Sequence, residues 1–311
     1  MTTKLKAKSV ISIDDLSAGE IVAVLDFADE LKKERNTGKN RPLLAGKSLA
    51  MLFEKPSTRT RVSFEVAMTE LGGHGIFIDL KTSQLGRGET VSDTAKTLSC
   101  YCSGIMARLF SHEAMKELAK EAAVPVISGL DDLEHPCQVL ADLQTVREKK
   151  GTLEGLKIAF VGDGENNVTH SLLLACAKLG ISMTVGCPKG YEPAREIVEK
   201  AKKHAAGKCD ITIVSTAEEA VKGADVVVAD TWVSMGDEAS GAKRIKDLAA
   251  FQVNAGLLKT AKKDAVFLHC LPCHRNQEVT GEVIDGKQSL VWTEAENRLH
   301  VQKALLAMLM G

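Results

Sequence analysis

Five consecutive residues of this sequence combine three hydroxyl groups with two guanidinium groups. The segment Ser57-Thr58-Arg59-Thr60-Arg61 follows shortly after the apolar run Ser48–Phe53. Its first two residues can cap a helix, whose unpaired N–H groups and partial positive charge suit a phosphate. Arg59 would add a planar set of charged donors. The pattern predicts a phosphate site. The plainer alternative is an ordinary cap with two surface arginines, and Arg61 could instead pair with a structural carboxylate.

A second glycine-containing turn has part of the pattern that binds dinucleotides. Gly162-Asp163-Gly164 follows an apolar run and precedes a helical pattern, but the position of the third glycine is Asn167. The acidic residue expected after the next strand is missing from Ser182–Cys187. The sequence therefore argues against a nicotinamide cofactor.

The segment from His269 to His274 contains residue types that bind metals. His269 and Cys270 are followed by Cys273 and His274, but no second Cys/His pair lies at the spacing of a zinc finger. Pro272 also restricts the local backbone. We expect no metal and no cofactor.

Apolar runs alternate with helical periodicity through the first half of the chain, which predicts an α/β domain with a parallel sheet. The first helix is centred on Ile21–Leu31. The expected strands are Ser48–Phe53, Gly75–Ile78, Ile105–Phe110 and Val124–Ser128. The other expected helices are Thr58–Leu71, Val91–Cys100, Glu113–Ala122 and Pro136–Lys149.

The pattern is interrupted between residues 149 and 155 and then starts again. The expected strands are Lys157–Val161, Ser182–Gly186, Ile211–Val214, Val226–Ala229 and Val266–Leu268. The expected helices are Thr169–Leu179, Pro193–His204 and Glu218–Lys222. A closing helix, Glu294–Met310, could return to the first half. The sequence thus predicts two doubly wound parallel-sheet domains, residues 1–150 completed by 294–311 and residues 151–293, with the active site in the cleft between them.

The composition is that of a globular protein. The chain has 311 residues, 44% hydrophobic and 26% charged, with a formal net charge of −1. This charge offers no electrostatic basis for binding nucleic acid or an anionic membrane. The basic N-terminus is not followed by the apolar stretch of a secretory signal, and no apolar run is long enough to cross a bilayer. With eight scattered cysteines, we expect reduced thiols and a cytoplasmic location.

Several motifs of the first half resemble those of the aspartate/ornithine carbamoyltransferase family. Phe53–Arg61, with Ser63-Phe64-Glu65 after it, resembles the carbamoyl-phosphate signature of that family. The remaining motifs occur in the family's order: Ser83–Glu89 resembles its mobile loop, Met106–Arg108 its strand-end arginine, and His135–Gln138 the motif that holds the carbamoyl group. The resemblance extends from about residue 10 to the C-terminus.

The second half indicates which amine accepts the carbamoyl group. Four segments resemble the ornithine-specific branch of the family: Gly162–Val168, Asp230–Gly236, His269–Pro272 and Glu294–Arg298. Ornithine also fits the chemistry of these residues. Its α-ammonium needs an acid and its carboxylate needs neutral donors, and Asp230, Asn167 and Ser234 supply these types near the ends of expected strands. No cluster of cations for a second carboxylate is visible there.

The resemblance implies a role for each site residue. The expected ligands of carbamoyl phosphate are Ser57, Thr58, Arg59, Thr60, Gln84, Arg108, His135, Gln138, Cys270, Leu271 and Arg298. The expected ligands of ornithine are Asn167, Asp230, Ser234 and Met235. The residues expected to act in catalysis are Cys270, Arg108, His135 and Asp230. Gln84 is expected to act on a neighbouring subunit's site, because the resemblance implies a homotrimer.

Other functions remain open from the sequence alone. A relative could use another amine, such as putrescine or an acylated ornithine. A non-catalytic sensor of phosphate or amino acids could have the same two lobes, although a sensor would not require the complete set of site residues. A nicotinamide-linked oxidoreductase is the third alternative.

Overall fold

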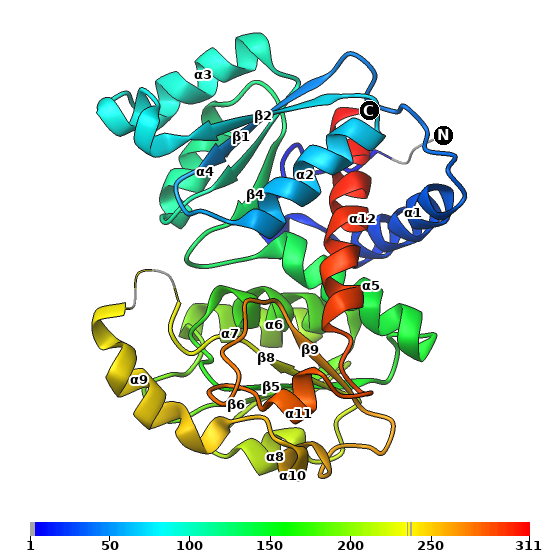
Figure 1. Cartoon of the computed structure of the whole chain (residues 1–311), viewed down its shortest axis with the longest axis vertical. Helices are drawn as coiled ribbons and strands as arrows, with labels where there is room; N and C mark the ends of the chain where they lie inside the picture. The colour runs from blue at the N-terminus through cyan, green and yellow to red at the C-terminus, as the bar shows by residue number, and fades with distance from the viewer. Residues whose placement is uncertain (1–3, 235, 237) are drawn as a thin grey trace. The chain divides into compact units, whose positions relative to one another are not determined.

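The chain forms two compact units (Figure 1). The computed structural model describes residues 4–234, 236 and 238–311. Unit 1 contains the chain up to Gln144 together with Glu296–Gly311, and unit 2 contains Thr145–Ala295. None of the described helices is long and apolar enough to cross a membrane.

Unit 1 is built on a four-stranded parallel sheet with the strand order β2-β1-β3-β4. The strands are β1 (Ser48–Phe53), β2 (His74–Asp79), β3 (Gly104–Arg108) and β4 (Val126–Leu130). Strands β3 and β4 are buried along their whole length, as expected where both faces of a parallel sheet are covered. The edge strand β2 is largely exposed.

The helices of unit 1 are α1 (Ala18–Asn36), α2 (Thr58–Glu70), α3 (Val91–Tyr101), α4 (His112–Glu121), α5 (Pro136–Lys150) and α12 (Val291–Met310), with short 3-10 turns η1 (Ile13–Asp15), η2 (Leu80–Thr82) and η3 (Leu85–Arg87). Most of helix α5 and of helix α12 is buried on all sides, whereas the other helices of unit 1 keep an exposed face. Leu52 and Ile105 of the sheet pack with Met115 and Leu118 of α4 in one apolar cluster. The boundary between the units falls inside α5 and α12.

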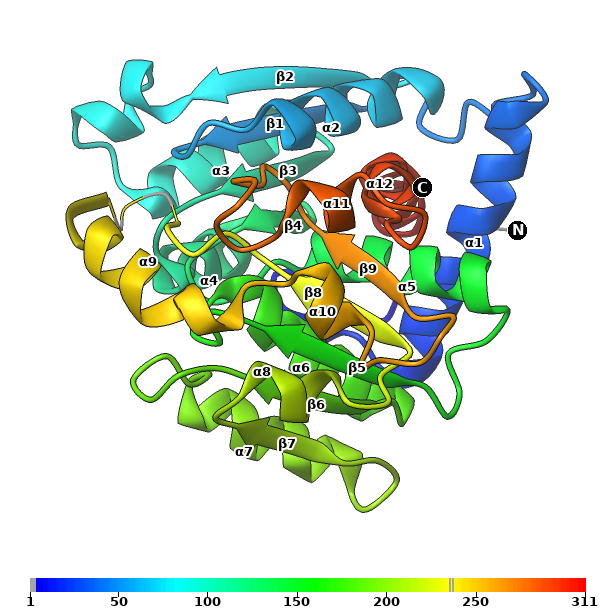
Figure 2. The same ribbon diagram turned by 60° about the horizontal axis from the view of Figure 1, so that its bottom comes forward.

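Unit 2 is built on a five-stranded parallel sheet with the order β7-β6-β5-β8-β9. Its strands are β5 (Lys157–Val161), β6 (Ser182–Gly186), β7 (Ile211–Val214), β8 (Val226–Ala229) and β9 (Val266–His269). Its helices are α6 (Asn167–Leu179), α7 (Arg195–Ala205), α8 (Ala217–Val221), α9 (Gly241–Leu248), α10 (Ala255–Leu258) and α11 (Gly281–Ile284), with 3-10 turns η4 (Glu238–Ser240) and η5 (Ala249–Phe251). Figure 2 shows β5 and β8 side by side at the centre of this sheet.

The predicted fold class of two parallel-sheet α/β domains is confirmed, and the differences are local. The last strand of unit 1 begins at Val126, after Pro125, which has no N–H to donate. It continues past Ser128 to Leu130 because its pairing with β3 shifts by one residue at Arg108. Helices α9, α10 and α11 were not predicted. They have eight, four and four residues, which are too few to show the 3.6-residue hydrophobic periodicity of a helix.

Candidate active site

The predicted phosphate turn lies between β1 and α2. Ser57 is the N-cap of α2, and its hydroxyl accepts a hydrogen bond from the backbone N–H of Thr60 at 3.2 Å. The same hydroxyl donates to Thr60 Oγ1 at 3.1 Å. Thr58 is exposed and Arg59 is half-buried. A capped helix start with backbone donors and hydroxyls is a suitable cradle for an anion.

Arg61 is directed to protein groups rather than to this cradle. Its Nε donates to Glu65 Oε1 at 3.0 Å, one turn further along α2. Its guanidinium carbon lies 3.8 Å from the centre of the Phe77 ring on β2. The structure thus gives Arg61 the structural pairing that the sequence had allowed.

Arg108 ends β3 beside the phosphate turn. In the β1–β3 ladder Phe53 pairs with Arg108, and the carbonyl of Arg108 accepts from the N–H of Glu54 at 2.9 Å. The side chain of Arg108 is buried. Two adjacent parallel strands therefore bring Arg108 and the turn after β1 to the same edge of the sheet.

Arg298, on α12, joins segments that lie far apart in the sequence. Its Nη1 donates to Gln138 Oε1 at 2.7 Å, and its Nη2 donates to Thr60 Oγ1 at 3.3 Å. Arg298, Gln138 and Thr60 are all buried. Gln138 Nε2 in turn donates to Asp142 Oδ1 at 2.8 Å, which fixes the direction of its amide. Asp142 thus orients Gln138, one of the predicted ligands of carbamoyl phosphate.

His135 immediately precedes α5 and is buried beside this arginine cluster. Burial, followed by the positive charges of Arg298, Arg108 and Arg59, lowers the pKa of His135 well below its usual value. The imidazole is therefore neutral at physiological pH. A neutral His135 can donate one hydrogen bond to a developing oxyanion without adding a charge, while the arginines supply the positive potential.

The turn that carries His135 is held by a buried aspartate. Asp131 Oδ1 accepts from the backbone N–H of Leu133 at 2.9 Å and from that of Glu134 at 2.8 Å. Asp131 Oδ2 lies 2.8 Å from His112 Nδ1. This hydrogen bond is the main cause of the raised pKa of His112. The His112–Asp131 pair thus fixes the turn that precedes His135 and thereby positions His135.

We expect this pair to make the stability of unit 1 depend on pH. A histidine whose pKa is raised by folding stabilises fully below its unfolded-state pKa, and this contribution is lost as pH rises through the folded-state pKa. The variant His112→Gln should therefore be less stable than the parent chain by on the order of 1–3 kcal/mol in mildly acidic buffer. The difference should shrink above neutrality. Unfolding followed by circular dichroism across pH 5.5–9 measures it, and a difference that grows with pH would contradict the assignment.

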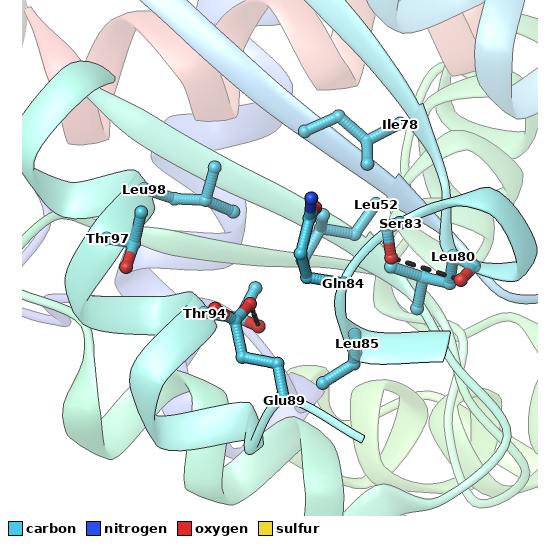
Figure 3. Close-up of a pocket in the computed structure, with 10 residues that line it drawn as sticks. All are labelled: Leu52, Ile78, Leu80, Ser83, Gln84, Leu85, Glu89, Thr94, Thr97 and Leu98. Atoms are coloured by element: carbon cyan, nitrogen blue, oxygen red, sulfur yellow. Dashed lines mark hydrogen bonds between the residues drawn. The ribbon is translucent and has the colours of Figure 1, made fainter. Parts of the chain in front are cut away.

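Gln84 lies in a loop that lines a separate cavity of unit 1. The cavity has a volume of about 180 Å³, and Figure 3 shows Gln84 among its lining residues. The lining includes Leu52 of β1 and Leu98 of α3, while Glu89 of the same loop accepts from the hydroxyl of Thr94 at 2.7 Å. The action of Gln84 on a neighbouring subunit stays a prediction.

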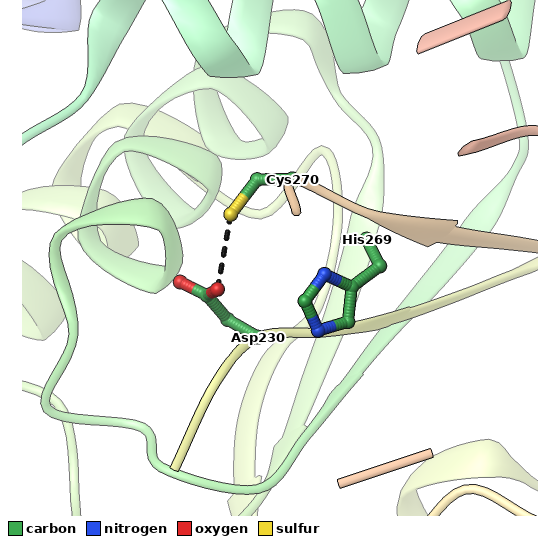
Figure 4. A group of neighbouring side chains, drawn as sticks. All are labelled: Asp230, His269 and Cys270. Atoms are coloured by element: carbon green, nitrogen blue, oxygen red, sulfur yellow. Dashed lines mark hydrogen bonds between the residues drawn. The ribbon is translucent and has the colours of Figure 1, made fainter. Parts of the chain in front are cut away.

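In unit 2, Asp230 and Cys270 follow two neighbouring strands. The β8–β9 ladder pairs Ala229 with His269, so the next residue of each strand end is a candidate site residue. The Cys270 thiol donates to Asp230 Oδ1 at 3.0 Å (Figure 4). Asp230 is buried and Cys270 is half-buried. The sheet thus brings together the predicted acid and the predicted cysteine.

Asp230, His269 and Cys270 offer possible metal-ligand atoms within 4.8 Å of one another. They could bind a metal only if these atoms were available for coordination. His269 Nδ1 accepts from the backbone N–H of Leu271 at 2.9 Å. His269 Nε2 lies 3.3 Å from Glu278 Oε1. Nδ1 is therefore occupied by a hydrogen bond within the protein, and Nε2 faces the carboxylate of Glu278 without a hydrogen bond. The remaining Asp230–Cys270 pair has fewer ligands than zinc sites use, and we infer no resident metal.

The remaining predicted ornithine ligands lie on the segments after β5 and β8. Asn167 is the first residue of α6, whose N-cap Asn166 accepts from the N–H of Thr169 at 2.8 Å. Asn167 and Ser234 are half-buried. Met235 lies outside the described residues. Because β5 and β8 are adjacent and parallel, Asn167 and Asp230 follow neighbouring strands at one edge of the sheet.

Arg244 of α9, which was not predicted from the sequence, holds the segment after Asp230. Its Nε donates to the carbonyl of Trp232 at 2.8 Å, and its Nη2 pairs with Asp163. Burial raises the pKa of Asp163 to about 6 despite this guanidinium. A lone arginine in a polar stretch carries no pattern that would reveal a contact across 81 residues.

The glycine-containing turn after β5 has a packing role. A Cβ at Gly164 would lie 2.7 Å from the carbonyl oxygen of Tyr191 and 3.0 Å from Pro193 Cδ. Any larger residue would push this segment away, which explains the glycine without a dinucleotide.

Comparison with known protein families identifies the family to which this chain belongs. The carbamoyl-P binding domain of aspartate/ornithine carbamoyltransferase matches residues 8–148, and the Asp/Orn binding domain matches residues 154–309. The chain belongs to the aspartate/ornithine carbamoyltransferase family. The resemblance inferred from the motifs is thereby confirmed, and the chain is a carbamoyltransferase.

Individual relatives of this carbamoyltransferase match it from end to end. An ornithine carbamoyltransferase of Carboxydothermus hydrogenoformans is 52% identical over 312 residues, covering 100% of both chains. One of Bacillus subtilis is 53% identical, covering 98% of this chain and 94% of the relative. The solved structure of ornithine carbamoyltransferase from Pyrococcus furiosus is 50% identical, with a TM-score of 0.96 and 99% of each chain covered.

Proposed function

We propose that this carbamoyltransferase transfers the carbamoyl group of carbamoyl phosphate to the δ-amine of L-ornithine, forming L-citrulline and phosphate. The observation that carries the proposal is the buried cluster of Arg298, Gln138 and Thr60 beside the capped start of α2. Donors of this kind suit a phosphate next to a carbonyl group. The relatives named for ornithine, which match over the whole chain, support the choice of acceptor.

Each substrate is assigned to one part of the chain. Carbamoyl phosphate is assigned to residues 1–150 completed by the C-terminal helix 294–311, and ornithine to residues 151–293. The phosphate ligands are Ser57, Thr58, Arg59, Thr60 and Arg108, and the ligands of the carbamoyl group are Arg108, His135, Gln138, Arg298 and the backbone at Cys270 and Leu271. Transfer requires that both sets of residues face a common cavity when the substrates are bound.

The ornithine pocket is assigned by charge. Asp230, a buried carboxylate, takes the α-ammonium. Asn167 and Ser234, with the backbone of Met235, position the amino-acid end. We further propose a cytoplasmic homotrimer in which Gln84 reaches the carbamoyl phosphate of a neighbouring subunit.

In the proposed mechanism the neutral δ-amine attacks the carbonyl carbon. The new C–N bond forms, the bond from carbon to the phosphate oxygen breaks, and one proton leaves the nitrogen. Thr60, Arg108 and neutral His135 stabilise the negative charge on the carbonyl oxygen. An amine of pKa about 10.4 is only ~0.04% neutral at pH 7, so presenting the free amine costs about 4–5 kcal/mol. The Cys270–Asp230 pair or the departing phosphate can take the proton.

The test is a citrulline-formation assay with the purified chain, carbamoyl phosphate and a panel of amines. L-Ornithine should be carbamoylated in preference to putrescine and N-acetylornithine, because only ornithine has both a free α-ammonium and a carboxylate. Faster turnover of either other amine would assign a different acceptor. Binding of carbamoyl phosphate without any product would instead support a sensor.

Replacing Cys270 with alanine should lower kcat at neutral pH and affect it less at alkaline pH. The thiol donates a hydrogen bond to Asp230, so it can relay a proton to that carboxylate. This proton relay contributes less at alkaline pH, because more of the δ-amine is already neutral. The pH–rate profiles of the parent chain and of Cys270→Ala measure this. A ratio of the two rates that stays constant with pH would remove Cys270 from proton transfer.

A further inference from the structure

A fully buried histidine–glutamate pair in unit 2 has no place in the mechanism above. His269, the last residue of β9, and Glu278 are both 0% exposed. His269 Nε2 lies 3.3 Å from Glu278 Oε1, but the geometry does not meet that of a hydrogen bond. Burying two titratable groups is costly unless they are paired, so this pair requires an explanation.

The hydrogen bonds of the pair define the tautomer of His269. The backbone N–H of Leu271 donates to His269 Nδ1 at 2.9 Å, so Nδ1 presents its lone pair. In a neutral imidazole the proton then resides on Nε2, which faces the carboxylate of Glu278. The opposite tautomer would point an N–H at the N–H of Leu271 and a lone pair at a carboxylate. Glu278 therefore selects the tautomer that accepts from Leu271.

Leu271 adopts a backbone conformation that needs such support. Its φ is +57°, in the left-handed region that side chains other than glycine and asparagine rarely adopt. The hydrogen bond from its N–H to His269 is one contact that holds it there. Glu278 holds the far side of the same turn, because its Oε1 also accepts from the backbone N–H of His274 at 2.5 Å.

The pair itself is anchored on two sides. The backbone N–H of His269 donates to Glu294 Oε2 at 2.9 Å, and the carbonyl of Glu278 accepts from the N–H of Val253 at 2.9 Å. Neighbouring Val279 lies in the apolar core of unit 2. A rigid support thus extends from the core through Glu278 and His269 to the backbone of Leu271.

We propose that Glu278 and His269 are positioning residues that fix the backbone of Cys270 and Leu271 for the carbamoyl amine. This inference rests on the proposed function, in which that backbone holds the amine. Neither side chain contacts substrate; they act through the tautomer of His269 and the conformation of Leu271. Losing the pair should therefore weaken recognition of the carbamoyl group and leave recognition of the phosphate group unchanged.

Two replacements of His269 separate its two nitrogens. Asparagine places an oxygen near the position of Nδ1 and can still accept from Leu271, whereas glutamine reaches toward Nε2 and leaves the N–H of Leu271 without its acceptor. His269→Gln should raise the KM for carbamoyl phosphate about tenfold, since a hydrogen bond is lost. His269→Asn should stay within about threefold of the parent chain.

Glu278→Gln tests the carboxylate at nearly constant shape. The glutamine oxygen can still accept from the backbone N–H of His274, but the negative charge that faces His269 Nε2 is lost, so the preference for the proton on Nε2 is weakened. We expect about a tenfold rise in the KM for carbamoyl phosphate. Glu282→Gln is the matched control, because Glu282 is an exposed acid four positions further along. It should change nothing.

Inorganic phosphate, the product, supplies the decisive comparison. Its inhibition constant should be unchanged in Glu278→Gln and His269→Gln, because phosphate lacks the carbamoyl group. Equal rises in the inhibition constant of phosphate and in the KM of carbamoyl phosphate would indicate general damage and overturn the proposal. So would an unchanged KM in both variants.

Amide hydrogen exchange of the segment 270–274 gives a readout that does not depend on turnover. Exchange should be faster in Glu278→Gln and His269→Gln than in the parent chain, and near normal in His269→Asn and Glu282→Gln. Unchanged exchange in the first two variants would refute the support of Leu271. If the parent chain formed no citrulline, the proposed function would fail, and the exchange rates would still decide whether the pair holds this backbone.

Discussion

Replacing Arg108 with glycine is expected to lower kcat/KM by at least about 100-fold while the fold is retained. Arg108 is buried at the end of β3, beside the capped start of α2, and it adds to the potential that keeps His135 neutral. Removing one preorganised donor to a developing oxyanion typically costs about 2.7–4 kcal/mol of transition-state stabilisation. Arg59→Gly should have an effect of the same order, measured by citrulline formation under saturating ornithine.

Guanidinium ions provide the control for this prediction. The Arg108→Gly variant leaves a space shaped for a guanidinium group, so guanidinium chloride, at concentrations far below those that unfold the chain, should restore part of the activity. The surface variant Arg195→Gly, whose parent side chain is 92% exposed, should keep its activity and show no such rescue. Near-normal turnover of Arg108→Gly would remove Arg108 from the site.

Replacing Asp230 with asparagine is expected to abolish the preference for an amine that carries an α-ammonium. Removing the charge of one partner of a buried charge pair costs about 2–5 kcal/mol, so kcat/KM for ornithine should fall by at least about 30-fold. Asparagine keeps an acceptor for the Cys270 thiol, which preserves the local hydrogen bond. Turnover of 5-aminopentanoate, which is ornithine without its α-ammonium, should change much less.

Asp225 supplies the matched control for the second prediction. It is also buried and flanks β8 at the opposite end, where it pairs with Lys262 at 2.9 Å. Asp225→Asn should lower stability without changing the preference for ornithine over 5-aminopentanoate. Equal loss of turnover on both amines in Asp230→Asn would contradict the assignment of Asp230 to the α-ammonium.

The features that could be predicted from the sequence are those formed by residues close to one another along the chain. The phosphate turn could be read because hydroxyls, arginines and a strand end lie within a few positions, and a helix start has known chemistry. The succession of strands and helices likewise follows from local periodicity. Arg108 was assigned to the site from the resemblance of Met106–Arg108 to the family's strand-end arginine, and the parallel pairing of β1 with β3 explains why it lies beside the turn.

Contacts that depend on tertiary packing could not be predicted in this way. Only the family resemblance assigned Arg298 and Thr60, 238 residues apart, to the same ligand, and no spacing or periodicity reveals their hydrogen bond or the contact by which Asp142 orients Gln138. The left-handed backbone of Leu271 and the tautomer of His269 depend on Glu278, a residue that a pattern search would treat as an ordinary surface acid. Such supporting residues have no characteristic spacing of their own.

The most direct measurement is a crystal structure of the chain with carbamoyl phosphate and L-norvaline, which is ornithine without the reacting δ-amine. The account predicts that Arg59 contacts the phosphate, that Asp230 contacts the α-ammonium, and that the end of the norvaline side chain points at the carbonyl carbon. A structure in which Arg59 and Asp230 line separate cavities, with the two ligands apart, would contradict it.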